Sequence, residues 1–209
     1  VWIVSTDHLS PGEQVLLMVN VGVATGGIGI VYAHELMHQK NRLERALGEV
    51  LMVLVLYGHF VTEHLAVHHR WVGTPKDAAT ARYNESFYRY FPRVLMDSFR
   101  SAWAVEAGRL RSKGAHVLSP ANPFWRYMGG AALFLLAAWL IGGWGGVGLF
   151  LVQAGVAILL LEQVNYVEHY GLVRRPTGQG KFEPVRPHHS WNAAHKLTNR
   201  LLINLQRHS

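Results

Sequence analysis

A stretch of 35 residues without one charged or histidine side chain limits the fold of this chain more than any other feature. It runs from Tyr127 to Leu161, and a second uncharged run of 20 residues extends from Gln14 to Ala33. About 20 consecutive apolar residues are enough for a helix to cross the hydrocarbon core of a bilayer. The sequence therefore predicts an integral membrane protein built from helices.

The longer apolar run contains a glycine-rich break, Gly142-Gly143-Trp144-Gly145-Gly146, which favours a turn. We expect two helices joined there as a hairpin, so that the chain returns to the side of the membrane it left. The 12 residues Val50–Val61 are also apolar, but a helix of that length covers only about 18 Å. This run predicts a helix that dips into the membrane surface.

A capping box marks the start of the first apolar helix. Ser10 stands at the N-cap, Pro11 follows at the first helical position, and Glu13 is placed to bond back to the Ser10 amide. The helix is expected to run through Ala33 into a histidine-rich segment.

The charge and the lack of cysteine restrict the possible functions. Twenty Lys and Arg against 13 Asp and Glu give a net charge of +7, which in a soluble chain would suggest nucleic acid. Beside apolar spans the same residues mark the cytoplasmic side of a membrane, and we expect no nucleic acid partner. Without cysteine, the chain can form neither disulfides nor thiolate metal sites, so nitrogen and oxygen must hold any metal.

Five histidines in the segment Val31–Arg70 have the spacing of metal ligands. His34 and His38, and likewise His64 and His68, are four residues apart and would share one face of a helix. His69 would point about 100° away from His68 on an α-helix, which suits two neighbouring metals better than one. We expect structural or solvated roles for the lone histidines, which are His8, His59, His116 and His195.

A zinc protease is a competing interpretation of the first pair. His34-Glu35-Leu36-Met37-His38 also fits the pattern H-E-x-x-H, in which two histidines bind zinc and the glutamate acts as a base. Three histidines and a water would satisfy one zinc ion, whereas this chain offers more histidines than one ion needs.

Four ordered segments resemble the signature segments of the membrane alkane 1-monooxygenases, which are related to the histidine-box fatty-acid desaturases and hydroxylases and to the xylene monooxygenases. They are His34–His38, Glu63–His69, Asn165–Leu172 and Leu205–Ser209, supported by Thr74–Asp77 and His188–Asn192. The resemblance implies two non-haem iron ions held by His34, His38, His64, His68, His69, His169 and His208. It also implies hydroxylation of the terminal methyl group of medium- or long-chain n-alkanes by O₂, with electrons from rubredoxin and its reductase. The alternative within this class is a fatty-acid desaturase or lipid hydroxylase.

Further residues are expected to support this site. Glu35, Glu63 and Glu168 each adjoin a ligand histidine and could orient neighbouring imidazoles, while simple charge balance is the less specific interpretation. His188 and His189 are not among the family's ligands and are assigned supporting or structural roles.

Counting back from His34 at helical spacing gives Ile30, Gly27 and Val23, a face that could form a substrate channel. Close helix packing at the glycine is the competing explanation.

A basic, aromatic stretch precedes the second half of the chain. Its apolar residues recur at helical spacing between arginines, and they are Phe87, Phe91, Val94, Leu95, Phe99 and Trp103. This pattern predicts an amphipathic helix on the membrane surface, bent or interrupted at Pro92. A helix packed on the protein itself is the alternative. Four basic residues could steer an acidic partner, namely Arg70, Arg82, Arg174 and Arg175. The competing explanation is that they reflect only the positive-inside bias.

Taken together, the sequence predicts an all-α membrane helical bundle with a histidine-rich di-iron site facing the cytoplasm. We expect residues 1–209 to form a single desaturase-like catalytic domain in the cell inner membrane. Because the chain starts at Val1 and the last histidine segment stops at Ser209, we also expect a fragment that lacks N-terminal spans and the end of that segment.

Overall fold

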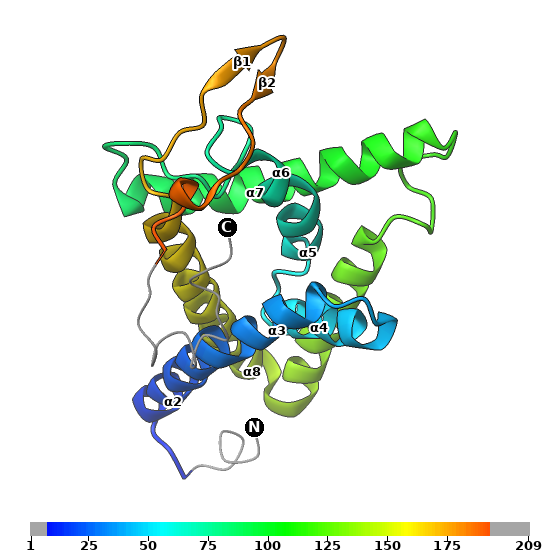
Figure 1. Cartoon of the computed structure of the whole chain (residues 1–209). Coiled ribbons are helices and arrows are strands. Elements are labelled where there is room, and N and C mark those ends of the chain that lie inside the picture. The colour runs from blue at the N-terminus through cyan, green and yellow to red at the C-terminus, as the bar shows by residue number, and fades with distance from the viewer. Residues whose placement is uncertain (1–7, 193–209) are drawn as a thin grey trace. The chain divides into compact units, whose positions relative to one another are not determined.

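The computed structural model describes residues 8–192, which are mainly helical (Figure 1). These residues form two compact units. The first contains the described residues up to Gly58 together with Phe124–Leu161, and the second contains His59–Pro123 and the described residues from Glu162 onward. His195 and His208 lie outside the described residues.

The first unit begins with a continuous helical segment, Pro11–Met37, that is long and apolar enough to cross a membrane. It consists of α2 (Pro11–Ala24), a π-helical turn η1 (Thr25–Gly29) and α3 (Ile30–Met37). The predicted capping box is confirmed: the Ser10 amide donates to Glu13 Oε2 at 2.8 Å, and the Glu13 amide donates to Ser10 Oγ at 3.4 Å.

The second apolar helix, α8 (Phe124–His169), folds back on itself where the sequence predicts a hairpin. Helical geometry is broken at Gly142 and Gly143, and Gly143 has a φ of 56°, a conformation that favours glycine. The two arms of α8 pack closely, since a Cβ at Gly146 would collide with the Ala138 carbonyl oxygen. Figure 1 shows this reversal of α8, and α8 is likewise long and apolar enough to span a bilayer.

Small residues let α2 and α8 approach each other. A Cβ at Gly22 would lie 2.8 Å from the Gln153 carbonyl oxygen, and one at Gly26 would lie 3.0 Å from Ala157 Cα. Large apolar side chains on these helices remain exposed, including Leu16 at 62%, Leu140 at 69% and Trp144 at 81%. Such apolar exposure is unfavourable in water and suits contact with lipid.

The run Val50–Val61 does not form the single dipping helix that we expected. Helix α4 (Arg42–Leu54), which starts at the N-cap Asn41, ends within it, and Leu56 has a φ of 58°. Helix α4 instead packs against α3 through Gly48, where a Cβ would lie 2.9 Å from the Ala33 carbonyl oxygen. The chain breaks here because this left-handed residue cannot continue an α-helix.

The second unit starts with α5 (Phe60–Glu63), a second π-helical turn η2 (His64–His68) and α6 (His69–Trp71). The long helix α7 (Phe87–Ser112) packs against α5 and η2 and continues through Pro92 without a break. One face of α7 is buried at four-residue spacing, through Tyr90, Val94, Ser98, Ala102 and Glu106. Val94, one of the apolar residues expected to define its stripe, is buried, whereas Phe99 is 45% exposed. Helix α7 therefore packs on its own unit, which is the alternative to a helix on the membrane surface.

A short antiparallel hairpin is the exception to the predicted all-α fold. It pairs β1 (Pro176–Gly178) with β2 (Lys181–Phe182), and a 3₁₀ turn, η3 (Pro187–His189), follows. The turn residues Gln179 and Gly180 have φ values of 51° and 72°, which is typical of a tight hairpin turn. The hairpin is too short for alternating hydrophobicity to predict it.

Candidate metal centre

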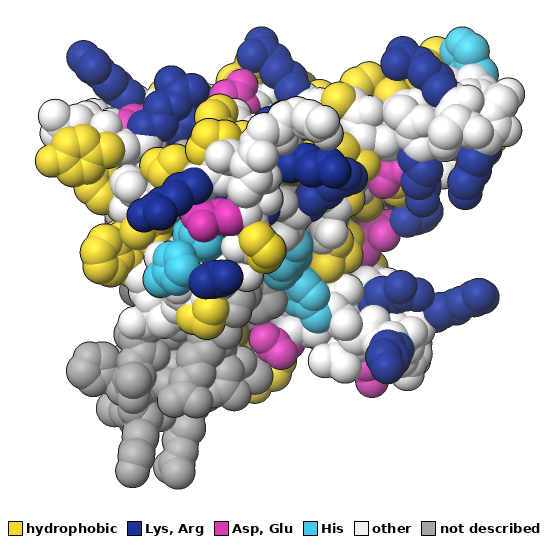
Figure 2. Space-filling view, turned by 45° about the horizontal axis from the view of Figure 1, so that its top comes forward, with side chains coloured by type: hydrophobic (Ala, Val, Ile, Leu, Met, Phe, Trp, Pro, Cys, Tyr) yellow, Lys and Arg dark blue, Asp and Glu magenta, His cyan; other side chains and the backbone are white. Residues whose placement is uncertain are grey.

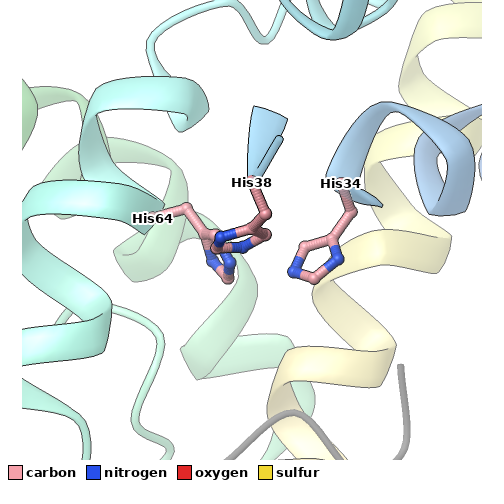
Figure 3. A group of neighbouring side chains, drawn as sticks. All are labelled: His34, His38 and His64. Carbon is pink, nitrogen blue, oxygen red and sulfur yellow. The ribbon is translucent and has the colours of Figure 1, made fainter. Parts of the chain in front are cut away.

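The first unit contributes the His34 and His38 imidazoles from the end of α3. Their ring centroids are 4.8 Å apart, and His34 is only 3% exposed. Figure 3 shows the side chains of His34, which lies on α3, and of His38, which is the C-cap residue of α3. The four-residue spacing thus places the two rings side by side, as the sequence predicts.

In the second unit, a π-helical turn brings three histidines together. The turn η2 covers His64–His68, and His69 is its C-cap residue. A π-turn contains more residues than an α-turn because its hydrogen bonds run from residue i to i+5. Residues five apart therefore come closer to the same face, and His69 returns toward His64 instead of pointing away as an α-helix predicts.

The rings in the second unit form one contiguous cluster. His64 Nε2 and His69 Nε2 are 3.0 Å apart, so that one ring donates to the other. The His68 centroid lies 5.3 Å from that of His64 and 4.7 Å from that of His169, which is at the end of α8. His64, His68 and His169 are all buried. Two nitrogens that bind one metal at right angles are themselves about 3.0 Å apart, as His64 and His69 are.

Asp77 fixes the orientation of His68. The two Asp77 carboxylate oxygens accept from His68 Nδ1 at 3.1 and 3.2 Å, and the Thr80 hydroxyl donates to Asp77 Oδ2 at 2.6 Å. Burial lowers the pKa of His68, but the Asp77 carboxylate opposes burial and raises this pKa to about 9. Because Asp77 holds the proton on Nδ1, Nε2 is the atom that a metal would bind after displacing the proton there, and the carboxylate makes that nitrogen a stronger donor to a metal.

A backbone carbonyl plays the same part for His169. His169 Nδ1 lies 3.4 Å from the carbonyl oxygen of His189, so Nδ1 carries the proton and Nε2 is available to a metal. This contact gives His189 a supporting role through its backbone.

The His189 ring itself is engaged elsewhere. The Arg186 amide donates to His189 Nδ1 at 2.9 Å, and His189 Nε2 lies 3.3 Å from Glu183 Oε1. Together with His188, these side chains lie close enough to hold an ion. However, Nδ1 already accepts a hydrogen bond, so the neutral ring must keep its proton on Nε2 and donate it to Glu183. This tautomer makes the group a hydrogen-bonded cluster and not a metal site.

A buried carboxylate next to the histidine cluster lacks a hydrogen-bond partner among the described residues. Glu63 is 1% exposed, and neither of its carboxylate oxygens has a described partner. Burial raises the pKa of Glu63 to about 8, and the charge of Asp77 contributes to this shift. An unpartnered buried carboxylate is costly unless a cation lies nearby, so its surroundings fit a metal.

The other predicted supporting residues are less closely engaged. Glu35 Oε1 lies 3.6 Å from His34 Nδ1, beyond hydrogen-bonding distance, and the backbone carbonyl of Glu168 accepts from the Trp191 amide. Val23 is 49% exposed, Gly27 has open space around it, and Ile30 is buried. The channel assigned to these last three residues remains a prediction.

Sequence reasoning paired the histidines whose rings lie side by side but missed the groups that orient them. Asp77 was noted only as part of a supporting segment. Another missed feature is the buried network of Glu162, whose Oε2 accepts from the Tyr90 hydroxyl and from Asn165 Nδ2, each at 3.1 Å. The only signal for it was a charged residue at the end of a long apolar run.

Imidazole donors with little carboxylate and no thiolate suit iron, zinc or copper. The donor set therefore fits a metal without choosing which one.

The chain is similar to a known protein family and to several curated proteins. A family model described as fatty acid desaturase matches residues 14–209. The chain is 44% identical over 193 residues to alkane 1-monooxygenase 1 of Pseudomonas aeruginosa, an overlap of 92% of this chain and 50% of that protein. It is 42% identical over 192 residues to alkane 1-monooxygenase 2 of Alcanivorax borkumensis, again 92% of this chain and 50% of the relative. A more distant relative is the xylene/toluene monooxygenase hydroxylase component XylM of Pseudomonas putida, 29% identical over 84% of this chain and 46% of its own length. The chain spans about half the length of the curated relatives it matches.

Proposed function

Because the chain belongs to the fatty acid desaturase family of membrane proteins, we propose that it forms the catalytic part of a di-iron monooxygenase that hydroxylates the terminal methyl group of medium- or long-chain n-alkanes. The observation that carries this proposal is the cluster of four imidazoles in the second unit, two of them oriented by Asp77 and by the His189 carbonyl. The names of the relatives at 42–44% identity support an alkane as substrate.

Two iron ions would be held by seven histidines. His34 and His38 would supply two nitrogens from α3, and the second unit would supply His64, His68, His69 and His169. His208, which lies outside the described residues, would complete the set of seven. Glu35, Glu63 and Glu168 would balance charge and orient rings around these ligands.

The bound irons would supply the activation of O₂. One oxygen atom would enter the alcohol, and the other would leave as water after taking up two electrons and two protons. The residues of the chain hold the ligand rings in position. Asp77 holds the His68 ring, the His189 carbonyl holds that of His169, and burial of these rings keeps bulk water from the reacting methyl group. Val23, Gly27 and Ile30 would guide the end of the alkane along the helix face that leads to His34.

The electrons require a separate carrier, which we propose to be rubredoxin with its reductase. The chain contains no nucleotide-binding glycine pattern in a strand–helix context that could serve a flavin or nicotinamide. Arg70, Arg82, Arg174 and Arg175 are cations that could steer an acidic carrier. On the positive-inside rule, the metal site would face the cytoplasm across the inner membrane.

Product analysis tests the reaction. The protein purified in detergent and supplied with rubredoxin, its reductase and O₂ should convert octane or hexadecane to the 1-alcohol. Oxidation of an acyl lipid instead, with the alkanes untouched, would identify a desaturase or lipid hydroxylase. About two irons per chain would support the di-iron proposal, whereas one zinc would favour the protease interpretation of His34–His38.

Substitution of two ligands tests the assignment of the site. His68→Ala and His69→Ala should each abolish hydroxylation and lower the iron content, while the protein still inserts into the membrane. His116→Ala is a suitable control, because His116 is exposed and its Nδ1 accepts from the Leu118 amide within its own loop. Full activity in either ligand variant would contradict the assignment.

A further inference from the structure

The second unit contains a cavity of about 550 Å³ to which the proposed reaction assigns no ligand. It is formed by the loop over residues 73–83, by α7 and by residues 172–173. Four cationic side chains line it, namely Lys76, Arg82, Arg93 and Arg100, against the carboxylates of Asp77 and Asp97. Lys and Arg side chains also outnumber acidic ones on the face drawn in Figure 2.

Arg93 builds the wall of the cavity. Its Nε and Nη2 donate to the Glu85 carboxylate at 2.7 and 2.8 Å, and its remaining donors reach the Ala78 and Thr80 carbonyl oxygens at 3.1 and 3.2 Å. These bonds use four of the five N–H donors of the guanidinium. Arg93 therefore fixes the loop and contributes positive potential, with one Nη1 donor left over.

Arg82 and Arg100 are the cations that can bind a ligand. Both side chains are exposed. Arg100 has one 3.6 Å contact with Asp97, a surface pair of little strength, and no ion pair of the Arg82 side chain occurs within residues 8–192. Lys76 adds charge from its position 4.1 Å above the Trp71 ring.

The carboxylates of the lining do not cancel this charge. Asp77 is turned toward His68 and Thr80, whose bonds occupy its oxygens. Asp97 has only its weak contact with Arg100, which an anion of higher charge would replace. The cavity thus presents two available guanidinium groups, which match phosphate oxygens in pairs.

We propose that this cavity binds the phosphate group of an anionic ligand, either the headgroup of an acidic phospholipid or a soluble phosphate. Its volume leaves room for substituents beside the phosphate. Tyr83 lines the cavity with 80% exposure, and Met96, 55% exposed, follows on the flank of α7 next to Arg100. Tyrosine and apolar side chains beside arginines are typical of surfaces that contact lipid headgroups, and the cytoplasmic leaflet offers acidic lipids.

Native mass spectrometry of the protein purified in detergent tests this proposal. Phosphatidylglycerol, phosphatidylcholine and inorganic phosphate are added in separate titrations, and bound adducts are counted for each. The double variant Arg82→Gln/Arg100→Gln should bind phosphatidylglycerol at least about tenfold more weakly than the wild type, because charged hydrogen bonds to the phosphate are lost.

Two further variants make the result specific. Arg111→Gln/Lys113→Gln removes the same charge from the far end of α7 and should leave binding unchanged. Arg82→Lys/Arg100→Lys keeps the charge and should retain part of the binding, which separates loss of charge from loss of fold.

Each outcome decides the proposal. Selective loss of phosphatidylglycerol binding supports a lipid headgroup site, and equal dependence of inorganic phosphate on the same arginines supports a soluble phosphate. Equal binding of all ligands to the wild type and the glutamine variant, or no phosphate binding to the wild type, would overturn the proposal. None of these measurements depends on hydroxylation, so the proposed reaction can fail independently.

Discussion

The usefulness of each histidine at this site depends on what its second ring nitrogen contacts. His68 and His169 are held by a carboxylate and by a backbone carbonyl, respectively, and both contacts leave Nε2 available. His189 has the opposite arrangement, since its Nδ1 accepts a backbone amide. Histidines that are neighbours in the fold, such as His169 and His189, can therefore differ in chemistry, which spacing in the sequence does not reveal.

Removing the charge of Asp77 should weaken metal binding. In Asp77→Asn, the His68 ring loses its strongest orienting partner, and we expect iron affinity or activity to fall by about 10- to 100-fold. Iron per chain and 1-alcohol formation measure this effect. Asp97→Asn is the matched control, because it removes a carboxylate of the same cavity that does not contact a histidine. Equal effects of both changes would contradict the positioning role.

His59 should make the protein less stable in mild acid. Burial lowers the pKa of His59 to about 4, below its usual value of 6.5, so the unfolded chain takes up a proton between these values while the folded chain does not. Stability from this group is complete above pH 6.5 and is lost as the pH falls, by about 2 kcal/mol at pH 5.

The His59→Gln variant tests this dependence. It can keep the contact of His59 Nε2 with the Ser98 hydroxyl, which is 3.4 Å long. Thermal unfolding in detergent should show a smaller loss between pH 7 and pH 5 for the variant than for the wild type. Parallel pH profiles of the two proteins would refute the assignment.

Helix and turn positions differ in how far the sequence predicts them. The capping box at Ser10 and the break at Gly142 and Gly143 are local, since each depends on neighbouring residues, and both are confirmed. The two π-turns were not predicted, because hydrophobic periodicity assumes 3.6 residues per turn throughout. The buried face of α7 was also missed, because its stripe includes polar and small residues such as Ser98 and Ala102.

Packing between α2 and α8 should tolerate a larger residue in place of glycine only on the side of α2 and η1 that has open space. A Cβ at Gly22 would lie 2.7 Å from Val156 Cβ, whereas nothing lies within 4 Å of one at Gly27. Gly22→Ala should therefore destabilise the protein by about 1–3 kcal/mol, and Gly27→Ala should be neutral or mildly stabilising. Thermal unfolding of the two variants in the same detergent checks this order. A similar loss in both would show that the close approach does not matter.

At the scale of the whole molecule, each unit holds its own group of histidines. The first has the pair on α3, and the second has the cluster around η2 and the end of α8. The sequence predicts which histidines of a unit lie together because residues four apart share one face of a helix. It could not predict Asp77 as a partner of His68, since that contact is made by a loop whose path depends on Thr80 and on Arg93.

If the seven proposed histidines hold iron, removing it should destabilise the protein. Treatment with a ferrous chelator should lower the unfolding temperature, and added Fe²⁺ should restore it, since a ligand at 100 times its Kd contributes about 2.7 kcal/mol. The variant His34→Ala/His38→Ala should lose most of this response although the cluster in the second unit is intact. An unchanged response in that variant would mean that the second unit binds iron independently.

The wide turn at His64–His68 also restricts how this protein can change over evolutionary time. A π-turn amounts to one residue inserted into an α-helix, and the insertion lets His69, five residues on, face His64. If the segment became an α-helix without a change of length, His69 would turn about 140° from His64, since each residue of an α-helix turns by about 100°. Loss of one residue between these two histidines would restore an α-helix with their rings four residues apart, so the length of the segment and its type of helix can only change together.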